Sequence, residues 1–243
     1  MRRLLPSRAP AACLAALLAL SSLLALAPRE SAAGPLEEYF FAVEQGIPDG
    51  DLSGLVDTRS LPQSELTIEF VTLELVLTPL DDDGFLGDLF ATLTHEGGGY
   101  AVLLNRPGRD PARPAGYSDN IPISIALSDT APADIHRYRL TLTGDDDLPL
   151  TGPLAGPWQP DGRAVDPLAV VSSDSRTAWL GSFAGSQPGG EWTLFVADVS
   201  TAAQYRLESW SLAISLVPEP STPRLLLVGG LICAVLGRRN PAR

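Results

Sequence analysis

Two histidines are the side chains that could act as a general base near neutral pH, and neither lies in a catalytic motif. A serine hydrolase needs a nucleophile, a base that activates it and a third group that orients the base. His95 lies in a Gly-rich turn and His136 lies beside Ile135 on a predicted strand, while the Gly-x-Ser-x-Gly motif is absent. We therefore predict that the protein is not an enzyme and that both histidines have structural or surface roles.

Two acidic clusters offer oxygen ligands for a hard cation. The clusters are Asp81, Asp82 and Asp83 with Asp88, and Asp145, Asp146 and Asp147. Ca²⁺ takes six to eight oxygen ligands, but an EF-hand loop starting at Asp81 would need Glu where Thr92 stands. A calcium site at Asp81, Asp83 and Asp88 is one interpretation, and solvated turns in which Asp accepts backbone hydrogen bonds are the other. No other cofactor is predicted.

The four tryptophans are the candidates for a sugar-binding surface. Trp192 and Trp210 continue alternating apolar patterns and are predicted to be core residues. Trp158 and Trp179 remain, either as surface platforms or as packing at a corner of the fold. Adjacent Asp residues on a loop give no sign of two carboxylates facing each other across a cleft, so glycoside hydrolysis is not predicted.

Composition and charge limit the classes of partner. The chain has 243 residues with 17 basic residues, all of them Arg, against 29 acidic residues, and its formal net charge is −12. Binding to a nucleic-acid backbone needs clustered positive charge, so we expect no nucleic-acid partner. The 22 Gly and 22 Pro residues favour many turns and short strands over long helices.

Hydrophobic residues in the middle of the chain recur with a period of two, which is typical of half-buried strands. The clearest series are Ile121, Ile123, Ile125 and Leu127; Trp192, Leu194 and Val196; and Trp210, Leu212, Ile214 and Leu216. Within 66–77 the inward phase shifts from even positions, including Phe70, to odd ones, so a bulge or break is expected near Val71. The glycines of 95–99 predict a hairpin between 89–94 and 100–104. These patterns predict an all-β, antiparallel, jelly-roll-like β-sandwich.

The N-terminal end has the order of a secretory signal peptide. Arginines at the start precede the apolar run 11–27, and small residues precede Gly34. We predict a signal peptide over 1–33, with an uncleaved anchor as the alternative. Cys13 lies in this segment and Cys233 lies near the other end, so the exported body is predicted to contain no disulfide.

The C-terminal end combines a short motif, an apolar run and a basic cluster. The motif is Val217, Pro218, Glu219, Pro220, Ser221 and Thr222. The run 225–237 is a short predicted transmembrane helix, and Arg238 and Arg239 after it should stay cytoplasmic. These three parts together resemble the PEP-CTERM sorting signal of Gram-negative bacteria, which implies recognition and cleavage by the membrane enzyme exosortase. A permanent tail anchor is the alternative.

The body also resembles the P domain (P/Homo B domain) of proprotein convertases. The matching segments are Ile47-Pro48-Asp49, Gly87-Asp88-Leu89, the VLLNRPG sequence of 102–108, the GEWTLFVAD sequence of 190–198 and the LESWSLAI sequence of 207–214. This resemblance implies a jelly-roll module that, in convertases, stabilises a neighbouring subtilisin-like catalytic domain and performs no chemistry. A serine endopeptidase activity would therefore belong to the neighbour.

The predicted organisation is a signal peptide at 1–33, an N-terminal segment at 34–44, a P-domain-like sandwich at 45–216 and the sorting signal at 217–243. We predict an exported, non-enzymatic structural or interaction module, transiently held in the inner membrane and then sorted to the cell surface or the extracellular polysaccharide matrix. Its predicted partners are an exosortase-type enzyme and an extracellular polysaccharide. The alternative is an accessory subunit or remnant associated with a separate serine endopeptidase.

Overall fold

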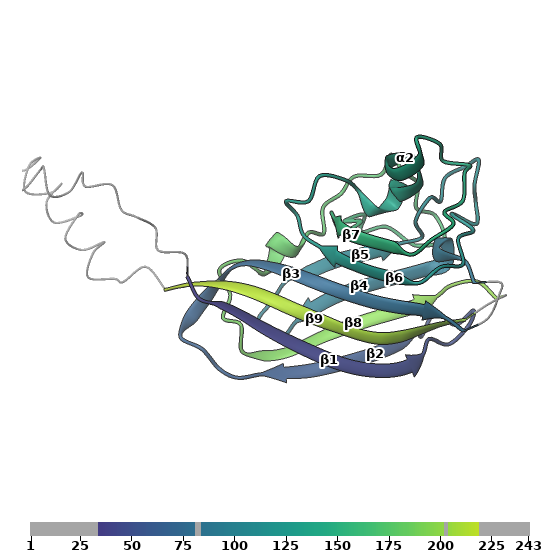
Figure 1. Ribbon diagram of the computed structural model, residues 1–243. Coiled ribbons are helices and arrows are strands. Elements are labelled where there is room, and N and C mark those ends of the chain that lie inside the picture. Colours follow the sequence, from purple (N-terminus) through teal and green to yellow (C-terminus); the bar gives the residue numbers. More distant parts are fainter. Residues whose placement is uncertain (1–33, 81–83, 202–203, 219–243) are drawn as a thin grey trace, which may run out of the picture. The chain divides into compact units, whose positions relative to one another are not determined.

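The body consists of two β-sheets that pack face to face (Figure 1). The computed structural model describes residues 34–80, 84–201 and 204–218. Sheet A has the order β1-β9-β3-β6-β7, and sheet B has the order β2-β8-β4-β5. The strands are β1 (Leu36–Gly46), β2 (Leu55–Leu61), β3 (Leu66–Pro79), β4 (Leu89–His95), β5 (Tyr100–Asn105), β6 (Ile123–Leu127), β7 (Leu154–Trp158), β8 (Gly190–Asp198) and β9 (Tyr205–Pro218). The predicted all-β sandwich is confirmed.

Strand pairing is antiparallel in both sheets except between β6 and β7, which are parallel. A parallel pair requires a long crossover connection. Here the crossover holds two short helices, η2 (Ile135–Arg137) and α2 (Tyr138–Thr143). The expectation of a purely antiparallel sandwich misses this pair, because an apolar alternation predicts a strand but not the direction of its partner.

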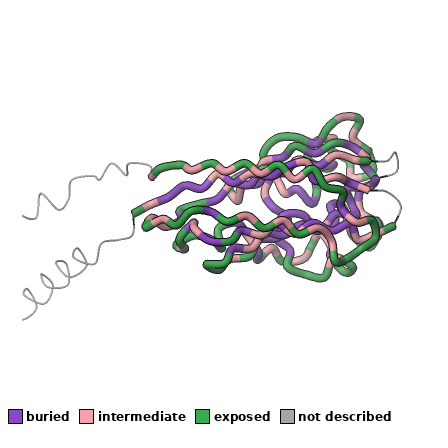
Figure 2. The backbone as a smooth tube through the Cα atoms, turned by 90° about the horizontal axis from the view of Figure 1, so that it is seen from below, coloured by how far each residue is buried: buried purple, intermediate pink, exposed green. Residues whose placement is uncertain are grey.

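The core lies between the sheets. Buried residues alternate with more exposed ones along the strands (Figure 2). Inward positions of β3, β8 and β9 are fully buried, as the period of two predicts. Trp192 and Trp210 are both buried in this core, which confirms their sequence prediction. The ring of Phe41 packs on Trp210 with centroids 4.6 Å apart, and the ring of Phe183 packs on Trp192 with centroids 4.9 Å apart.

The predicted irregularity in β3 is present, slightly earlier in the chain than expected. The register of β3 with β9 shifts between Ile68 and Phe70, so Glu69 is the extra residue. Val71 is buried and Phe70 is 53% exposed. The expectation that Phe70 faces inward is therefore wrong, because the bulge reverses the face before Phe70 rather than after it.

The predicted hairpin joins β4 to β5 through the turn 96–99. Gly98 and Gly99 both have φ of 104°, a conformation that side chains with a Cβ rarely adopt. A Cβ on Gly99 would lie 2.3 Å from the ring of Phe183, whereas a Cβ on Gly98 would meet no neighbouring atom within 4 Å. Gly98 is therefore required only for the geometry of the turn, whereas a side chain at Gly99 would also collide with Phe183.

Both ends of the described body lie at the same end of the sandwich (Figure 1). Leu36 pairs with Ser215, the amide of Leu216 donates to the carbonyl of Pro35 at 3.0 Å, and Leu66 pairs with Pro218. The predicted N-terminal segment 34–44 thus supplies most of β1, an edge strand of sheet A.

Several predicted features fall outside the described residues. These are the signal peptide 1–33, Asp81 and Asp83, Glu219 to Thr222, the apolar run 225–237, and Arg238 and Arg239. Within the ranges that are described, no helix has the length and apolar character needed to span a membrane.

Candidate functional site

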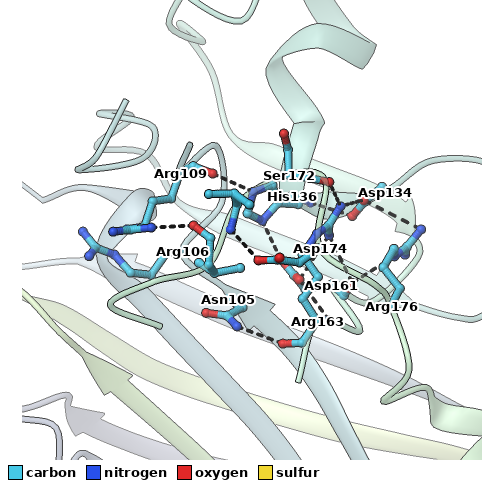
Figure 3. A network of polar contacts seen from close by, with 12 residues as sticks. Asn105, Arg106, Arg109, Asp134, His136, Asp161, Arg163, Ser172, Asp174 and Arg176 are labelled. Atoms are coloured by element: carbon cyan, nitrogen blue, oxygen red, sulfur yellow. Dashed lines mark hydrogen bonds and ion pairs between the residues drawn. The ribbon is translucent and has the colours of Figure 1, made fainter. Parts of the chain in front are cut away.

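The most extensive buried polar network surrounds His136, in the connection between β6 and β7 (Figure 3). His136 is fully buried and lies in η2, so its predicted place on a strand is wrong. The side chain of Asp134 accepts a hydrogen bond from the His136 amide and thereby caps this helical turn. Asp134 directly before the turn is the residue type favoured at a helix start, and it is the signal in the sequence that indicates this turn.

Both ring nitrogens of His136 face oxygen acceptors. Nδ1 lies 2.7 Å from Oδ2 of Asp161, and Nε2 lies 3.1 Å from the carbonyl oxygen of Arg109. Both ring nitrogens are therefore engaged by oxygen atoms of the fold, one by a carboxylate and the other by a backbone carbonyl. This arrangement leaves no ring nitrogen available as a base.

Asp161 is fully buried and also contacts the guanidinium of Arg163. Its Oδ1 lies 3.2 Å from Nη1 of Arg163. The Nη2 atom of Arg163 donates to Oδ2 of Asp134 at 2.8 Å. Arg163 Nη2 also donates to the carbonyl oxygen of Ser172, so this serine contributes its backbone and not its hydroxyl. Arg176 closes the network through the carbonyl of Asp161 at 2.9 Å. The cluster therefore joins three loops by charge-assisted bonds, and it holds the long β6–β7 crossover against the sandwich.

His95 occupies a different environment at the end of β4. Its ring stacks on Trp192 with centroids 4.3 Å apart, and Nε2 lies 3.1 Å from the carbonyl of Gly189. Burial lowers the pKa of His95 below its usual value, which favours the neutral ring. His95 and His136 lie in separate contact sets, and neither set includes a serine or threonine hydroxyl bonded to the ring.

Asp88 is the one residue of the predicted calcium site that the described ranges include. It ends the helical turn η1 (Leu86–Asp88), is buried, and binds Nη2 of Arg106 through Oδ1 at 3.0 Å. Arg106 also donates from Nε to the carbonyl of Gly87 at 2.9 Å. One oxygen of this carboxylate is therefore already paired with an arginine. Asp81 and Asp83 lie outside the described residues, so the calcium site remains a prediction.

Asp198 lies beside this pair at the end of β8 and was not identified from the sequence. It is 1% exposed, its Oδ2 has no hydrogen-bond partner, and Oδ1 faces the amide of Ser200 at 3.4 Å. Burial raises the pKa of Asp198 to about 7, and the negative charges of Asp88 and Asp49 add to this increase. Burial also raises the pKa of Asp88. Nowhere in 34–80, 84–201 and 204–218 do three acidic, His or Cys side chains gather closely enough to hold a metal.

The second acidic cluster, Asp145 to Asp147, is occupied by arginines. Asp146 lies 2.7 Å from Arg137 and 3.6 Å from Arg113, and Asp147 lies 3.1 Å from Arg113. The solvated-turn interpretation is therefore closer to the structure than the cation-site interpretation, although the charges are neutralised by arginines rather than by water alone.

The two candidate tryptophans differ in position. Trp158 ends β7, is 3% exposed and donates from Nε1 to the carbonyl of Ala155, so its interpretation as a surface platform is wrong. Trp179 is half-buried, and the guanidinium of Arg176 lies 4.2 Å from its ring centroid. Trp179 lines a surface hollow of about 470 Å³ together with Asp129 and Thr177.

Comparison with known proteins assigns no family to the chain. No family model matches the chain, and no curated protein matches it. A crystal structure of the serine protease of Aeromonas sobria in complex with its chaperone is similar at 16% identity, with a TM-score of 0.38. The match covers 82% of this chain and 29% of the matched chain of that complex, so this chain spans less than a third of the matched chain's length. The likeness to a P domain and to a PEP-CTERM signal remains a prediction from the sequence.

Proposed function

We propose that the protein is an exported, non-enzymatic binding module of the bacterial cell exterior, released from the membrane when an exosortase-type enzyme cleaves its C-terminal segment. The observation that carries this proposal is the position of the motif. Val217 and Pro218, its first two residues, are also the last two residues of β9. The sandwich therefore ends where the motif begins, and cleavage after it would leave both sheets intact.

The position of the two body ends supports the same delivery route. Pro35 and Leu216 are hydrogen-bonded neighbours, so the chain enters and leaves the sandwich side by side. Segments attached at these ends would hold the body by one end and leave the rest of its surface accessible. Pro220 and Pro218 also favour extended backbone at the preceding residues, which is the conformation that a processing protease binds.

The contacts of the histidines support a role without chemistry. Both nitrogens of His136 are used within the fold, and Nε2 of His95 binds a carbonyl. We expect the exported protein to hydrolyse no member of a peptide library. Turnover that is lost on replacing His95 with Gln would contradict this part of the proposal.

Mass spectrometry of the exported protein tests the processing step. We expect the surface or secreted form to end at or close to Pro220 and to lack 221–243. In a Glu219→Ala variant we expect the C-terminal segment to remain and the protein to stay in the inner-membrane fraction. Glu65→Ala, an exposed change near the same end of the sandwich, should be processed normally.

Peptides from 225–237 in the exported wild-type protein would show a permanent anchor and refute the sorting proposal. Co-purification from the cell envelope tests the binding role separately. A stoichiometric serine endopeptidase would favour the accessory role implied by the P-domain resemblance, and polysaccharide without such an enzyme would favour the module proposed here.

A further inference from the structure

Three neighbouring hollows share lining residues, and the first two lie on the outer face of sheet A. The first, of about 470 Å³, contains Phe40, Glu38 and Glu74 in its lining. The second, of about 260 Å³, shares Thr72 with the first and is lined by Phe70. The third is the hollow beside Trp179, and it shares Asp129 and Gly181 with the second. We call the three together the sheet A groove; it runs from the edge strand β1 to η3 (Leu180–Phe183).

The groove exists because strand β9, which lies between β1 and β3, presents small side chains between larger ones. Ser211 pairs with Phe40 on one side and with Glu74 on the other. Ala213 pairs in the same way with Glu38 and Thr72. Small residues along β9 thus form a floor, and the flanking strands supply rims that stand above it.

Three aromatic side chains are placed along this groove. Phe40 is 71% exposed and Phe70 is 53% exposed, although burial of either ring would be favourable in water. Trp179 is held in one plane, because its Nε1 donates to the carbonyl of Arg176 and the guanidinium of Arg176 packs on the ring. Arg176 is itself fixed by three oxygen acceptors. The remaining ring surface lines the hollow as a rigid platform.

The charged side chains that line the groove are acidic: Glu38, Glu74 and Asp129. At the third hollow the guanidinium of Arg176 packs on the Trp179 ring. The carboxylate of Asp129 is fixed by the amides of Leu180 and Gly181 at 3.1 and 2.6 Å, so its position does not depend on a ligand. Aromatic faces attract cations, and carboxylates bind ammonium groups directly. The surface is therefore complementary to a cationic, elongated ligand.

We propose that the sheet A groove binds a linear polysaccharide with free amino groups, of the glucosamine type. Sugar rings pack their C–H faces on Phe40, Phe70 and Trp179, and the ammonium groups contact Glu38, Glu74 and Asp129. Hydroxyls of Thr72, Thr177 and Ser211 lie along the same path. This ligand gives chemical content to the binding role proposed above and rests on it.

Other occupants fit this surface less well. A second copy of the chain, docked through the same face, would bring Glu38 and Glu74 against their own equivalents, and like charges across an interface are unfavourable. A basic peptide would satisfy the carboxylates, but the aromatic rings project from an open face and do not form the closed pockets that anchor peptide side chains.

Titration calorimetry of the exported protein with chitosan oligosaccharides tests the proposal. We expect Phe40→Ala, Phe70→Ala and Trp179→Ala each to weaken binding about fivefold or more, because truncating an aromatic anchor removes the contact area. Val56→Ala, which shortens an exposed apolar side chain on β2, is the matched control and should bind as the wild type does. The aromatic variants keep every charge, so attraction to the acidic body as a whole is unchanged.

Each outcome decides the proposal, and none depends on whether the C-terminal segment is cleaved. Loss of affinity in the three aromatic variants and retention in the control support it. Absence of binding, or equal binding by the aromatic variants, overturns it. Equal binding of fully acetylated chitin oligosaccharides overturns the role of the carboxylates. Tighter binding of oligolysine, weakened by the same substitutions, would reassign the groove to basic peptides.

Discussion

Two buried carboxylates at different places in the fold show how differently the protein treats a charge in its interior. Asp161, in the network of the β6–β7 crossover, binds the ring of His136 and the guanidinium of Arg163. Asp198, at the end of β8, has an Oδ2 without a hydrogen-bond partner and lies near two other carboxylates. Both are almost fully buried. Burial alone therefore does not determine the charge of these groups; the partners do.

The difference teaches that one carboxylate holds structure together and the other opposes it at neutral pH. Asp161 joins the buried ring of His136 to the buried guanidinium of Arg163, which also pairs with Asp134. The carboxylate of Asp198 loses its contact with water on folding, and its Oδ2 gains no hydrogen bond in return. This loss of hydration is the main reason that the pKa of Asp198 rises to about 7. Arg106 partly offsets the negative charge at this end of the sandwich, but it is already bound to Asp88.

The largest expected effect is at Asp161. Asp161→Asn keeps the shape of the side chain and removes the charge, so His136 and Arg163 lose the carboxylate that they share. We expect the free energy of unfolding to fall by about 3–5 kcal/mol, as for the loss of one partner of a buried ion pair. Urea unfolding measures it.

The matched control for this substitution is Glu65→Gln, an exposed carboxylate, which should change stability by no more than about 0.5 kcal/mol. A loss below about 1 kcal/mol for Asp161→Asn would show that the network is not a structural anchor, and the comparison of the two carboxylates would fail.

Asp198→Asn is expected to increase the free energy of unfolding, in contrast to Asp161→Asn. The increase should be seen only above mildly acidic pH. The unfolded pKa is near 3.8 and the folded pKa is about 7, so the folded state binds the extra proton between these values. Stability from this group is therefore complete below about pH 4 and is lost as pH rises to about 7. We expect the variant to be more stable than the wild type by about 1–3 kcal/mol at pH 8 and equal to it near pH 4.

Unfolding of both proteins across this pH range separates Asp198 from other titrating groups. The pKa of His95 is lowered, so its contribution to stability is lost as the pH falls, because the folded state then binds fewer protons than the unfolded state. This contribution is the same in both proteins. A stability difference that is independent of pH would show that Asp198 stays charged in the folded state.

Sequence reasoning recovered the parts of the fold that depend on local pattern. Alternating residues predicted the inward faces of β8 and β9, and the phase change in 66–77 predicted the bulge in β3. Gly98 and Gly99 predicted the hairpin because few other residues adopt their backbone conformation. The parallel β6–β7 pair could not be predicted, since it depends on how a long crossover packs.

The candidate site was harder to predict, because its partners are distant in the chain. His136 and Asp161 are 25 positions apart, and no local motif connects them. Asp198, however, has a signal in the sequence: it continues the inward-facing series of Trp192, Leu194 and Val196. A carboxylate at an inward position of a strand is unusual enough to indicate a group with a shifted pKa.

The smallest expected effect is at Arg113, which contacts more carboxylates than Asp161 contacts cations but lies nearer the solvent. Its guanidinium lies 2.5 Å from Asp110, 3.1 Å from Asp147 and 3.6 Å from Asp146. If ion pairs near the solvent stabilised the fold as much as buried ones do, Arg113→Met would lower the free energy of unfolding as much as Asp161→Asn. Solvent screens these pairs, so we expect a loss of about 0.2–1 kcal/mol, measured by urea unfolding and reduced further at high salt. Methionine keeps much of the packing on Tyr117, whose ring the guanidinium approaches to 5.8 Å. A loss of several kcal/mol that high salt leaves unchanged would mean that this cluster is as integral to the fold as the His136 network, and that position relative to solvent is not what separates the two.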